Sequence, residues 1–81
     1  MPQYYFDVQD SDGWFVDEVG MELADMDSAI REARLAIADM MRDALRGQSD
    51  EGILIRIRDG ADGPVLLSVT LTTELPPDTA T

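Results

Sequence analysis

The sequence predicts an α+β domain: a single four-stranded antiparallel sheet with one helix packed on one face, in the order β-β-α-β-β. Three observations favour this fold. Apolar and polar residues alternate in one region near the N-terminus and in another near the C-terminus, as in strands with one buried face. Between them, apolar residues recur with the period of a helix. Asp-Gly sequences divide each alternating region into two strands. With 81 residues, 44% of them hydrophobic, the chain can form one domain, predicted over residues 1–74.

The first hairpin is predicted from alternation on both sides of an acidic turn. In the first strand, Tyr4, Phe6 and Val8 are expected to face the core, with the residues between them facing away. The chain then reverses at Asp10-Ser11-Asp12-Gly13, because Asp and Gly tolerate the backbone conformations of tight turns. Residues 14–16 start the return strand.

Two registers of this hairpin stay open. A two-residue Asp12-Gly13 turn places Phe15 opposite Asp10 and on the face of Val8. A three-residue loop places Val16 on that face instead. Residues 21–24 are then expected to form a short connection to the helix.

The helix is predicted from Met26 to about Arg46. Asp25 can accept hydrogen bonds from the free N–H groups of the first turn, and Gly47 is a natural stop. Leu35 points to the side of the helix opposite the apolar stripe, and the pattern gives no reason for an apolar residue there. The stripe marks the face that packs on the sheet, and its residues are Ile30, Ala33, Ile37, Met40, Met41 and Ala44.

The second hairpin joins two apolar strands, residues 53–58 and 65–72. We expect Ile57 to lie opposite Leu67 and Ile55 opposite Val69, which places both apolar sets on one face. Ala61-Asp62-Gly63 is then a three-residue loop between Gly60 and Pro64, with Gly63 in the left-handed conformation. Residues 75–81 have two prolines and no periodicity, and they are predicted to be a disordered C-terminal tail.

One face of the predicted sheet has no helix to cover it. It carries more apolar residues than a purely solvated face needs, so we expect a homodimer that forms through this face or through an edge strand. Its residues are predicted to be Tyr5, Leu54, Leu66, Arg56, Arg58 and threonines, with either Trp14 and Val16 or Phe15.

Missing residue types exclude several functions. The chain has no Cys and no His, and all six of its basic residues are Arg, which removes thiolate, imidazole and Schiff-base chemistry. No spacing singles out two of the 17 acidic residues as a catalytic pair. We therefore predict no catalytic, cofactor-binding or metal-binding residue, no cofactor and no enzyme. No apolar run has the length of a membrane span and no signal peptide is recognised, so a cytoplasmic protein without a membrane partner is expected.

The acidic turn has some likeness to a calcium loop, since hard cations bind clustered carboxylates around a sharp Gly turn. With Gly13 in the sixth position of such a loop, Val8 is the first residue and Val19 the twelfth, so both terminal carboxylates are missing. A plain hairpin turn is the preferred interpretation.

Charge is distributed unevenly along the chain. The net charge is −11, and residues 1–27 hold eight acids and no base, which opposes direct binding of nucleic acid. The acidic hairpin either docks on a basic protein or mimics phosphates, or it is a solvated surface. The residues predicted to contact a protein partner are Tyr5, Asp12, Trp14, Asp17, Glu18, Leu54, Arg56 and Arg58.

Short segments along nearly the whole chain carry a resemblance: Pro2-Gln3-Tyr4-Tyr5-Phe6-Asp7-Val8, Asp17, Gly20, Glu22-Leu23-Ala24-Asp25, Ala29 to Ala33, Arg58-Asp59 and Gly63-Pro64-Val65. Together they resemble a family of short alphaproteobacterial, largely rhizobial, proteins classed as a domain of unknown function. This resemblance implies a bacterial protein and brings no active site with it.

A weaker resemblance is to the HicB-type antitoxin module, in which a hairpin with an Asp-Gly turn precedes an Ala-rich helix. The corresponding residues are Tyr5, Asp12-Gly13, Trp14 and Asp27-Ser28-Ala29-Ile30. That family usually carries a Pro and a Gly between hairpin and helix, where this chain has Leu23-Ala24, and often a C-terminal DNA-binding segment, where this chain has a short tail. The likeness therefore implies inhibition of a protein partner and not repression of an operator. The predicted function is thus a small acidic protein-interaction module; the alternatives are an antitoxin-like inhibitor of a basic RNA-directed toxin and a carboxylate-dependent metal-binding protein.

Overall fold

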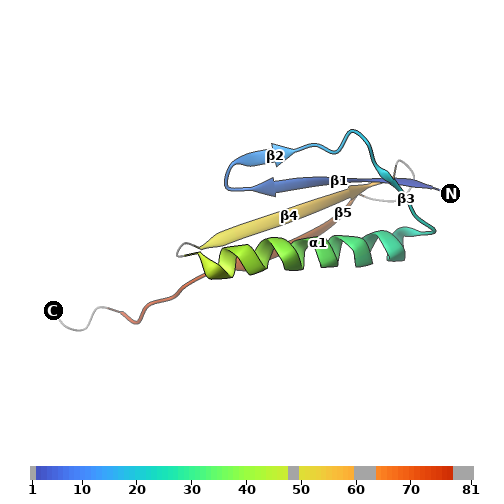
Figure 1. Cartoon of the computed structure of the whole chain (residues 1–81). Coiled ribbons are helices and arrows are strands. Elements are labelled where there is room, and N and C mark those ends of the chain that lie inside the picture. The colour runs from blue at the N-terminus through green and yellow to red at the C-terminus, as the bar shows by residue number, and fades with distance from the viewer. Residues whose placement is uncertain (1, 48–49, 60–63, 78–81) are drawn as a thin grey trace.

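The structure is a computed structural model that describes residues 2–47, 50–59 and 64–77. In Figure 1, helix α1 lies along one face of an antiparallel sheet, which confirms the predicted α+β fold. The elements in chain order are β1 (Gln3–Asp10), β2 (Gly13–Phe15), β3 (Met21–Glu22), α1 (Met26–Arg46), β4 (Glu51–Arg58) and β5 (Val65–Leu71).

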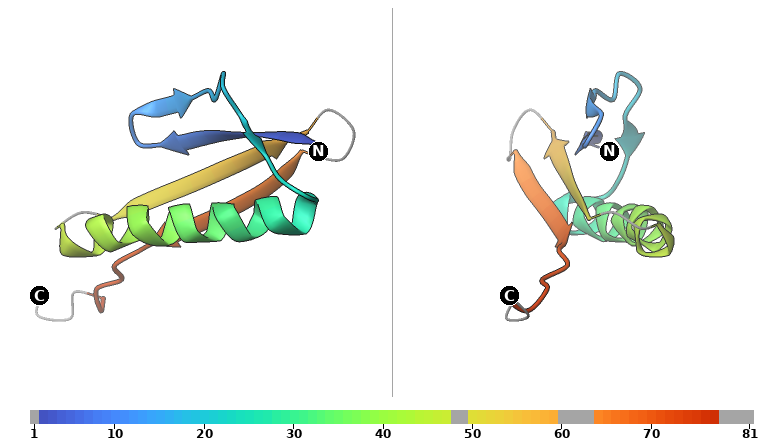
Figure 2. Two further views of the ribbon diagram at one scale, coloured as in Figure 1. Left: turned by 45° about the vertical axis from the view of Figure 1, so that its right-hand side comes forward. Right: turned by 90° about the vertical axis from the view of Figure 1, so that its left-hand side faces the viewer.

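The strand order places the N-terminal strand β1 beside β4 at the centre of the sheet and leaves the C-terminal strand β5 at an edge. The order is β2-β1-β4-β5, so β1 and β4 are direct neighbours although the helix separates them in sequence. Their pairing places Tyr5 opposite Arg58 and Asp7 opposite Arg56. Figure 2 shows α1 beneath β4 and β5, while β1 and β2 lie farther from it.

The strand β3 corrects the prediction of a four-stranded sheet with a plain connection at residues 21–24. Gln3 pairs with Glu22 and Tyr4 with Met21, and the N–H of Leu23 donates to the carbonyl of Pro2 at 3.1 Å. Two residues form too weak a pattern to be recognised as a strand, but they satisfy backbone groups of β1 that β2 is too short to reach.

The first hairpin resolves the open register. Its two-residue loop is Ser11-Asp12, one residue earlier than the Asp12-Gly13 turn, and Val8 pairs with Phe15. The carboxylate of Asp10 accepts the N–H of Asp12 at 2.8 Å, which starts the reversal early, and Gly13 follows with a φ of +121°. Phe15 therefore shares the face of Val8, as the two-residue alternative required, although it lies opposite Val8 and not Asp10.

The register predicted for the second hairpin is wrong by two residues. Ile55 pairs with Leu67 and Ile57 with Val65. A slip of two keeps every side chain on its predicted face, so the apolar pattern could not distinguish the two registers.

Beyond the strand ends, the carboxylate of Asp50 binds the N–H and hydroxyl of Thr73 at 2.9 and 2.8 Å. The predicted loop at residues 61–63 lies outside the described residues, as do residues 78–81 of the predicted tail.

The helix has the predicted bounds. The carboxylate of Asp25 accepts the N–H of Ser28 at 2.8 Å, and the N–H of Gly47 donates to the carbonyls of Asp43 and Ala44. Leu35 is 61% exposed and faces away from the sheet, as expected.

The apolar core lies between α1 and the inner face of the sheet, which is the face toward the helix. Figure 2 shows that α1 runs beside β4 and β5, so β1 and β2 are less well covered. Phe15 is accordingly 57% exposed, and a hollow of about 230 Å³ separates β1 from the helix near Phe6, Val8 and Ala36. The buried apolar residues are Tyr4, Ala29, Ala33, Ile37, Met41, Ile53, Ile55 and Ile57.

Candidate functional site

The outer face of the sheet, opposite α1, is the surface that most of the predicted contact residues share. Strand pairing places them there because residues directly opposite in an antiparallel ladder point to the same side. Trp14 and Leu54 flank Gln9 from its two neighbouring strands, and Arg56 lies opposite Asp7. The outer-face residues used below are Tyr5, Asp7, Gln9, Trp14, Leu54, Arg56, Arg58, Leu66, Ser68 and Thr70.

A buried carboxylate lies at the centre of this face. Asp7 has no exposed surface, and two arginines of β4 cover it. Arg58 donates from Nε to Oδ2 at 2.6 Å and from Nη2 to Oδ1 at 3.0 Å, a two-pronged geometry that suits a guanidinium and a carboxylate. Arg56 donates from Nε to Oδ2 at 2.8 Å. The charge of Asp7 is thus paired twice, which a buried carboxylate requires.

The electrostatics of the cluster favour its charged form. The hydrogen bonds from Arg58 lower the pKa of Asp7 to about 2, against the opposing effect of burial, with further help from the N–H of Asp17 and from Arg56. The same ion pair raises the pKa of Arg58 above its ordinary value. Asp7 is therefore ionised throughout the neutral range and acts as an anchor for two cations, not as a proton donor.

Two aromatic side chains stack on the arginines. The guanidinium carbon of Arg56 lies 4.4 Å from the centroid of the Trp14 ring, and that of Arg58 lies 5.0 Å from the Tyr5 ring. Both distances are within the range of cation–π attraction. Trp14 is 41% exposed, so the stack presents an ordered aromatic surface to solvent. We call Asp7, Arg56, Arg58, Tyr5 and Trp14 the outer-face cluster.

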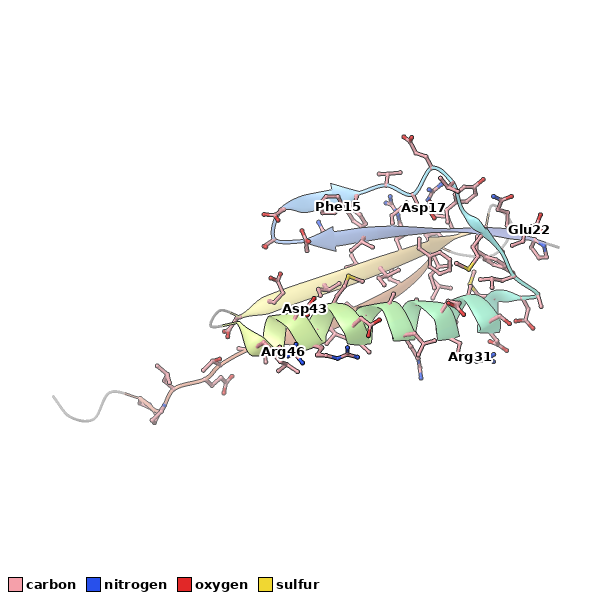
Figure 3. The ribbon with its side chains drawn as sticks, viewed as in Figure 1. Phe15, Asp17, Glu22, Arg31, Asp43 and Arg46 are labelled. Atoms are coloured by element: carbon pink, nitrogen blue, oxygen red, sulfur yellow. The ribbon has the colours of Figure 1, made fainter. Side chains whose placement is uncertain are left out.

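Asp17 closes the gap between β2 and β3 along the edge of β1 (Figure 3). Its carboxylate accepts the N–H of Phe6, which no strand pairs on that side, at 3.0 Å, and also the N–H groups of Val19 and Gly20. Its own N–H donates to Oδ1 of Asp7 at 2.9 Å, and its carbonyl accepts from Arg58 at 3.1 Å. The loop after β2 is thereby tied to the outer-face cluster.

Burial raises the pKa of Asp17, but the N–H groups of Gly20, Phe6 and Val19 outweigh it and hold the pKa below its usual value. Both oxygens of this carboxylate are used inside the domain, which gives Asp17 a structural role. Its predicted contact with a partner stays a prediction.

Apart from Asp17, the structure separates the predicted contact residues into two groups. Tyr5, Trp14, Leu54, Arg56 and Arg58 share the outer face. In contrast, Asp12 and Glu18 are exposed on the turns beside it. The sequence analysis missed Asp7, the residue around which the face is organised. The available signal was an acid at an outward position of one strand and two arginines at outward positions of another, but only strand order brings them together.

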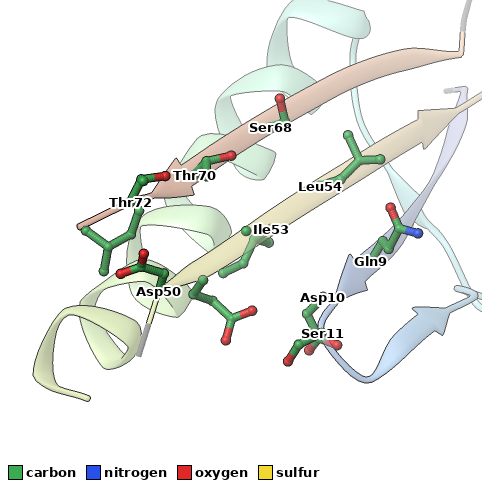
Figure 4. A pocket seen from close by; sticks show the side chains of 12 residues that line it. Gln9, Asp10, Ser11, Asp50, Ile53, Leu54, Ser68, Thr70 and Thr72 are labelled. Carbon is green, nitrogen blue, oxygen red and sulfur yellow. The ribbon is translucent and has the colours of Figure 1, made fainter. Parts of the chain in front are cut away.

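Besides the hollow beside the helix, the structure has a hollow of about 460 Å³ on the outer face (Figure 4). It lies between the end of β1, the start of β4 and the end of β5. Asp10 and Ser11 line one side, and Asp50 and Thr72 line the other. The backbone N–H and hydroxyl of Thr73 bind Asp50 and lower its pKa. Within the described residues, no three His, Cys, Asp or Glu side chains converge as a metal site would require.

Fold and site together define a small α+β domain of strand-strand-helix-strand-strand order whose outer sheet face holds a buried ion-pair cluster under aromatic side chains. Residues 3–72 match the family model described as Domain of unknown function (DUF6894), and the chain belongs to that family. No curated protein and no solved structure shows a significant match. Nor does any helix in residues 2–47, 50–59 or 64–77 have both the length and the apolar character needed to cross a membrane.

Proposed function

We propose that this domain is a small acidic, non-enzymatic protein-interaction module whose partner docks on the outer face of the sheet. The observation that carries the proposal is the stack of Arg56 on the half-exposed Trp14 at 4.4 Å. Trp, Tyr and Arg contribute most of the binding energy in many interfaces. A side chain that is already ordered in the free protein also loses less entropy on binding.

The charge around the stack indicates what kind of partner fits. Within the outer-face cluster and the loop tied to it, two arginines balance Asp7 and Asp17, so the surface potential there comes from the exposed acids of the hairpin. Asp12 and Glu18 are both exposed beside the outer face. We expect a basic protein surface with an apolar pocket for Trp14, since opposite potentials favour association.

The carboxylates also support a binding role over catalysis. Asp7, Asp17, Asp25 and Asp50 all have their pKa values lowered. A general acid or base works best with a pKa near neutrality, which requires shifts in the opposite direction. A cytoplasmic location and the absence of an enzymatic activity stay predictions from the sequence.

Affinity capture from a host lysate with the tagged protein tests the proposal. Wild type is compared with Trp14→Ala and with Leu35→Ala, which truncates a similarly exposed apolar side chain on the helix, far from the outer face. We expect one stoichiometric partner, recovered at least about tenfold less with Trp14→Ala and unchanged with Leu35→Ala. Thermal melts of both variants confirm that the fold is retained.

The charge of the partner is tested by washing at low and high salt. The double variant Asp12→Lys, Glu18→Lys is expected to weaken capture and to reduce its salt dependence. Equal recovery with wild type and Trp14→Ala, or no recovered partner, would contradict the proposal. A ribonuclease-type partner would support the antitoxin alternative, for which the structure adds no observation of its own.

A further inference from the structure

The far edge of the sheet is open. Strand β5 ends the order β2-β1-β4-β5, and no strand among the described residues pairs on its other side. Its pairing with β4 is continuous over seven residues, from Ile57 opposite Val65 to Glu51 opposite Leu71, without a bulge. Such an edge presents a regular row of unpaired N–H and C=O groups to any strand that approaches.

The devices that normally protect an edge strand are missing from β5. Proteins block edges with charged side chains, an internal proline, a bulge or a very short strand. Residues 63–73 contain no charged side chain and form the longest uncharged run in the chain. Leu66 is 61% exposed and Val69 is 36% exposed, although both are apolar side chains that gain from burial.

The distribution of charge along the chain favours a second copy over a basic partner at this edge. Two molecules that each carry a net charge of −11 repel one another, so a self-contact is least costly where no acid lies at the surface. The edge of β5 meets this condition, whereas the edge of β2 and β3 lies within the acidic region of residues 10–22. A basic partner, in contrast, gains nothing from an uncharged edge.

We infer that two copies of this chain pair through β5, antiparallel about a twofold axis near Ser68, the central residue of the strand. This pairing continues the ladder from one copy to the next and places both helices on the same side of one long sheet. The outer faces of the two copies then lie side by side on the other side. Although β5 contributes Leu66, Ser68 and Thr70 to the outer face, the inference does not depend on the proposed function, because it rests on the backbone edge of β5 and the proposed function rests on the stack of Trp14 and Arg56.

Light scattering on the purified full chain measures the mass directly. We expect twice the 8.9 kDa chain mass, with the dimer more stable at high salt, because salt screens the repulsion between the two acidic copies. This sign is opposite to the one expected for a basic partner on the outer face. The variant Ser68→Lys places two like charges opposite each other, so we expect the monomer mass. Ser11→Lys makes the same change on the exposed turn of the first hairpin, and we expect its dimer to be unchanged.

Cysteine crosslinking tests the contact separately, because the natural chain contains no cysteine. Opposite residues of an antiparallel pair have Cα atoms about 4.5 to 5.5 Å apart, within the range of a disulfide. Among Leu66→Cys, Ser68→Cys and Thr70→Cys, we expect at least one to form a covalent dimer much faster than Ser11→Cys. A monomer at all concentrations overturns the inference. So does a dimer that survives Ser68→Lys and crosslinks at none of the three positions, and neither result bears on capture through Trp14.

Discussion

At one edge of the sheet, β2, β3 and the carboxylate of Asp17 together cover the side of β1 that faces away from β4. At the other edge, no strand among the described residues pairs with the side of β5 that faces away from β4. The first edge lies in an acidic part of the chain and the second in its longest uncharged run. At the first edge, which we call the covered edge, the carboxylate of Asp17 accepts the N–H of Phe6, which neither β2 nor β3 reaches. The comparison shows that the edge of β1 is covered through specific contacts between residues distant in sequence, whereas the open edge of β5 needs only a regular strand.

The covered edge depends most strongly on Asp7. Replacing it by Ala removes the acceptor for Arg56, Arg58 and the N–H of Asp17 at once. We expect Asp7→Ala to lower the free energy of unfolding by about 3 kcal/mol, the lower end of the cost of breaking a buried ion pair, because the arginine side chains left behind are 34% and 38% exposed. Urea unfolding followed by the fluorescence of Trp14, the one tryptophan of the chain, measures the loss.

The control is Asp12→Ala, which removes an exposed carboxylate of the neighbouring turn. A change within about 0.5 kcal/mol is expected there. Equal losses for the two variants would show that the outer-face cluster does not hold this edge together.

Asp17 has the next largest expected effect. Asp17→Ala leaves the N–H groups of Phe6, Val19 and Gly20 without their acceptor. We expect a loss of about 2 to 3 kcal/mol, because the N–H groups of Phe6 and Gly20 are part-buried and all three groups lose a charged acceptor. Asp17→Asn keeps one acceptor oxygen and is expected to lose roughly half as much. Amide hydrogen exchange at Phe6 should become faster in Asp17→Ala, and an unchanged rate there would argue against the role of this carboxylate.

Acid weakens the covered edge through the same carboxylate that Asp7→Ala removes. The pKa of Asp7 is about 2 in the folded protein and 3.8 ordinarily, so its stabilisation is complete above the ordinary value and is lost as the pH falls through 2. We expect the difference in unfolding free energy between wild type and Asp7→Ala to shrink by about 2 kcal/mol between pH 5 and pH 2. Urea titrations across this range measure it, and a constant difference would contradict the lowered pKa.

The smallest expected effects on stability come from one glycine near each edge of the sheet. Gly20, in the loop of the covered edge, has a φ of +79°, and an added Cβ would lie 2.9 Å from side-chain atoms of Gln3 and Tyr5. We expect Gly20→Ala to cost about 1 to 2 kcal/mol. Gly52, opposite Thr70 on the hairpin of the open edge, has no such neighbour closer than 3.8 Å. Gly52→Ala should be neutral or stabilising by up to about 1 kcal/mol, and thermal unfolding of the two variants shows whether this order holds.

Local signals in the sequence were sufficient for the helix and for the faces of the strands. Asp25 and Gly47 mark the helix ends through contacts with their immediate neighbours, so the bounds at Met26 and Arg46 were predictable. Alternation likewise placed Tyr4 in the core and Arg56 outside it. The registers were harder, because a slip of two residues preserves every face, and the pairing of Ile57 with Val65 depends on the whole hairpin.

The sequence by itself therefore determined the fold class, the helix and the sidedness of the strands, all of which follow from periodicities of a few residues. The tertiary structure alone decided the strand order, and with it the burial of Asp7 under Arg56 and Arg58, which are 49 and 51 residues away. It also decided that the carboxylate of Asp17 substitutes for a missing ladder partner of Phe6. The physical reason is that a buried charge and an unpaired backbone N–H are paired with residues distant in the sequence. The local sequence pattern does not indicate which distant residues these are.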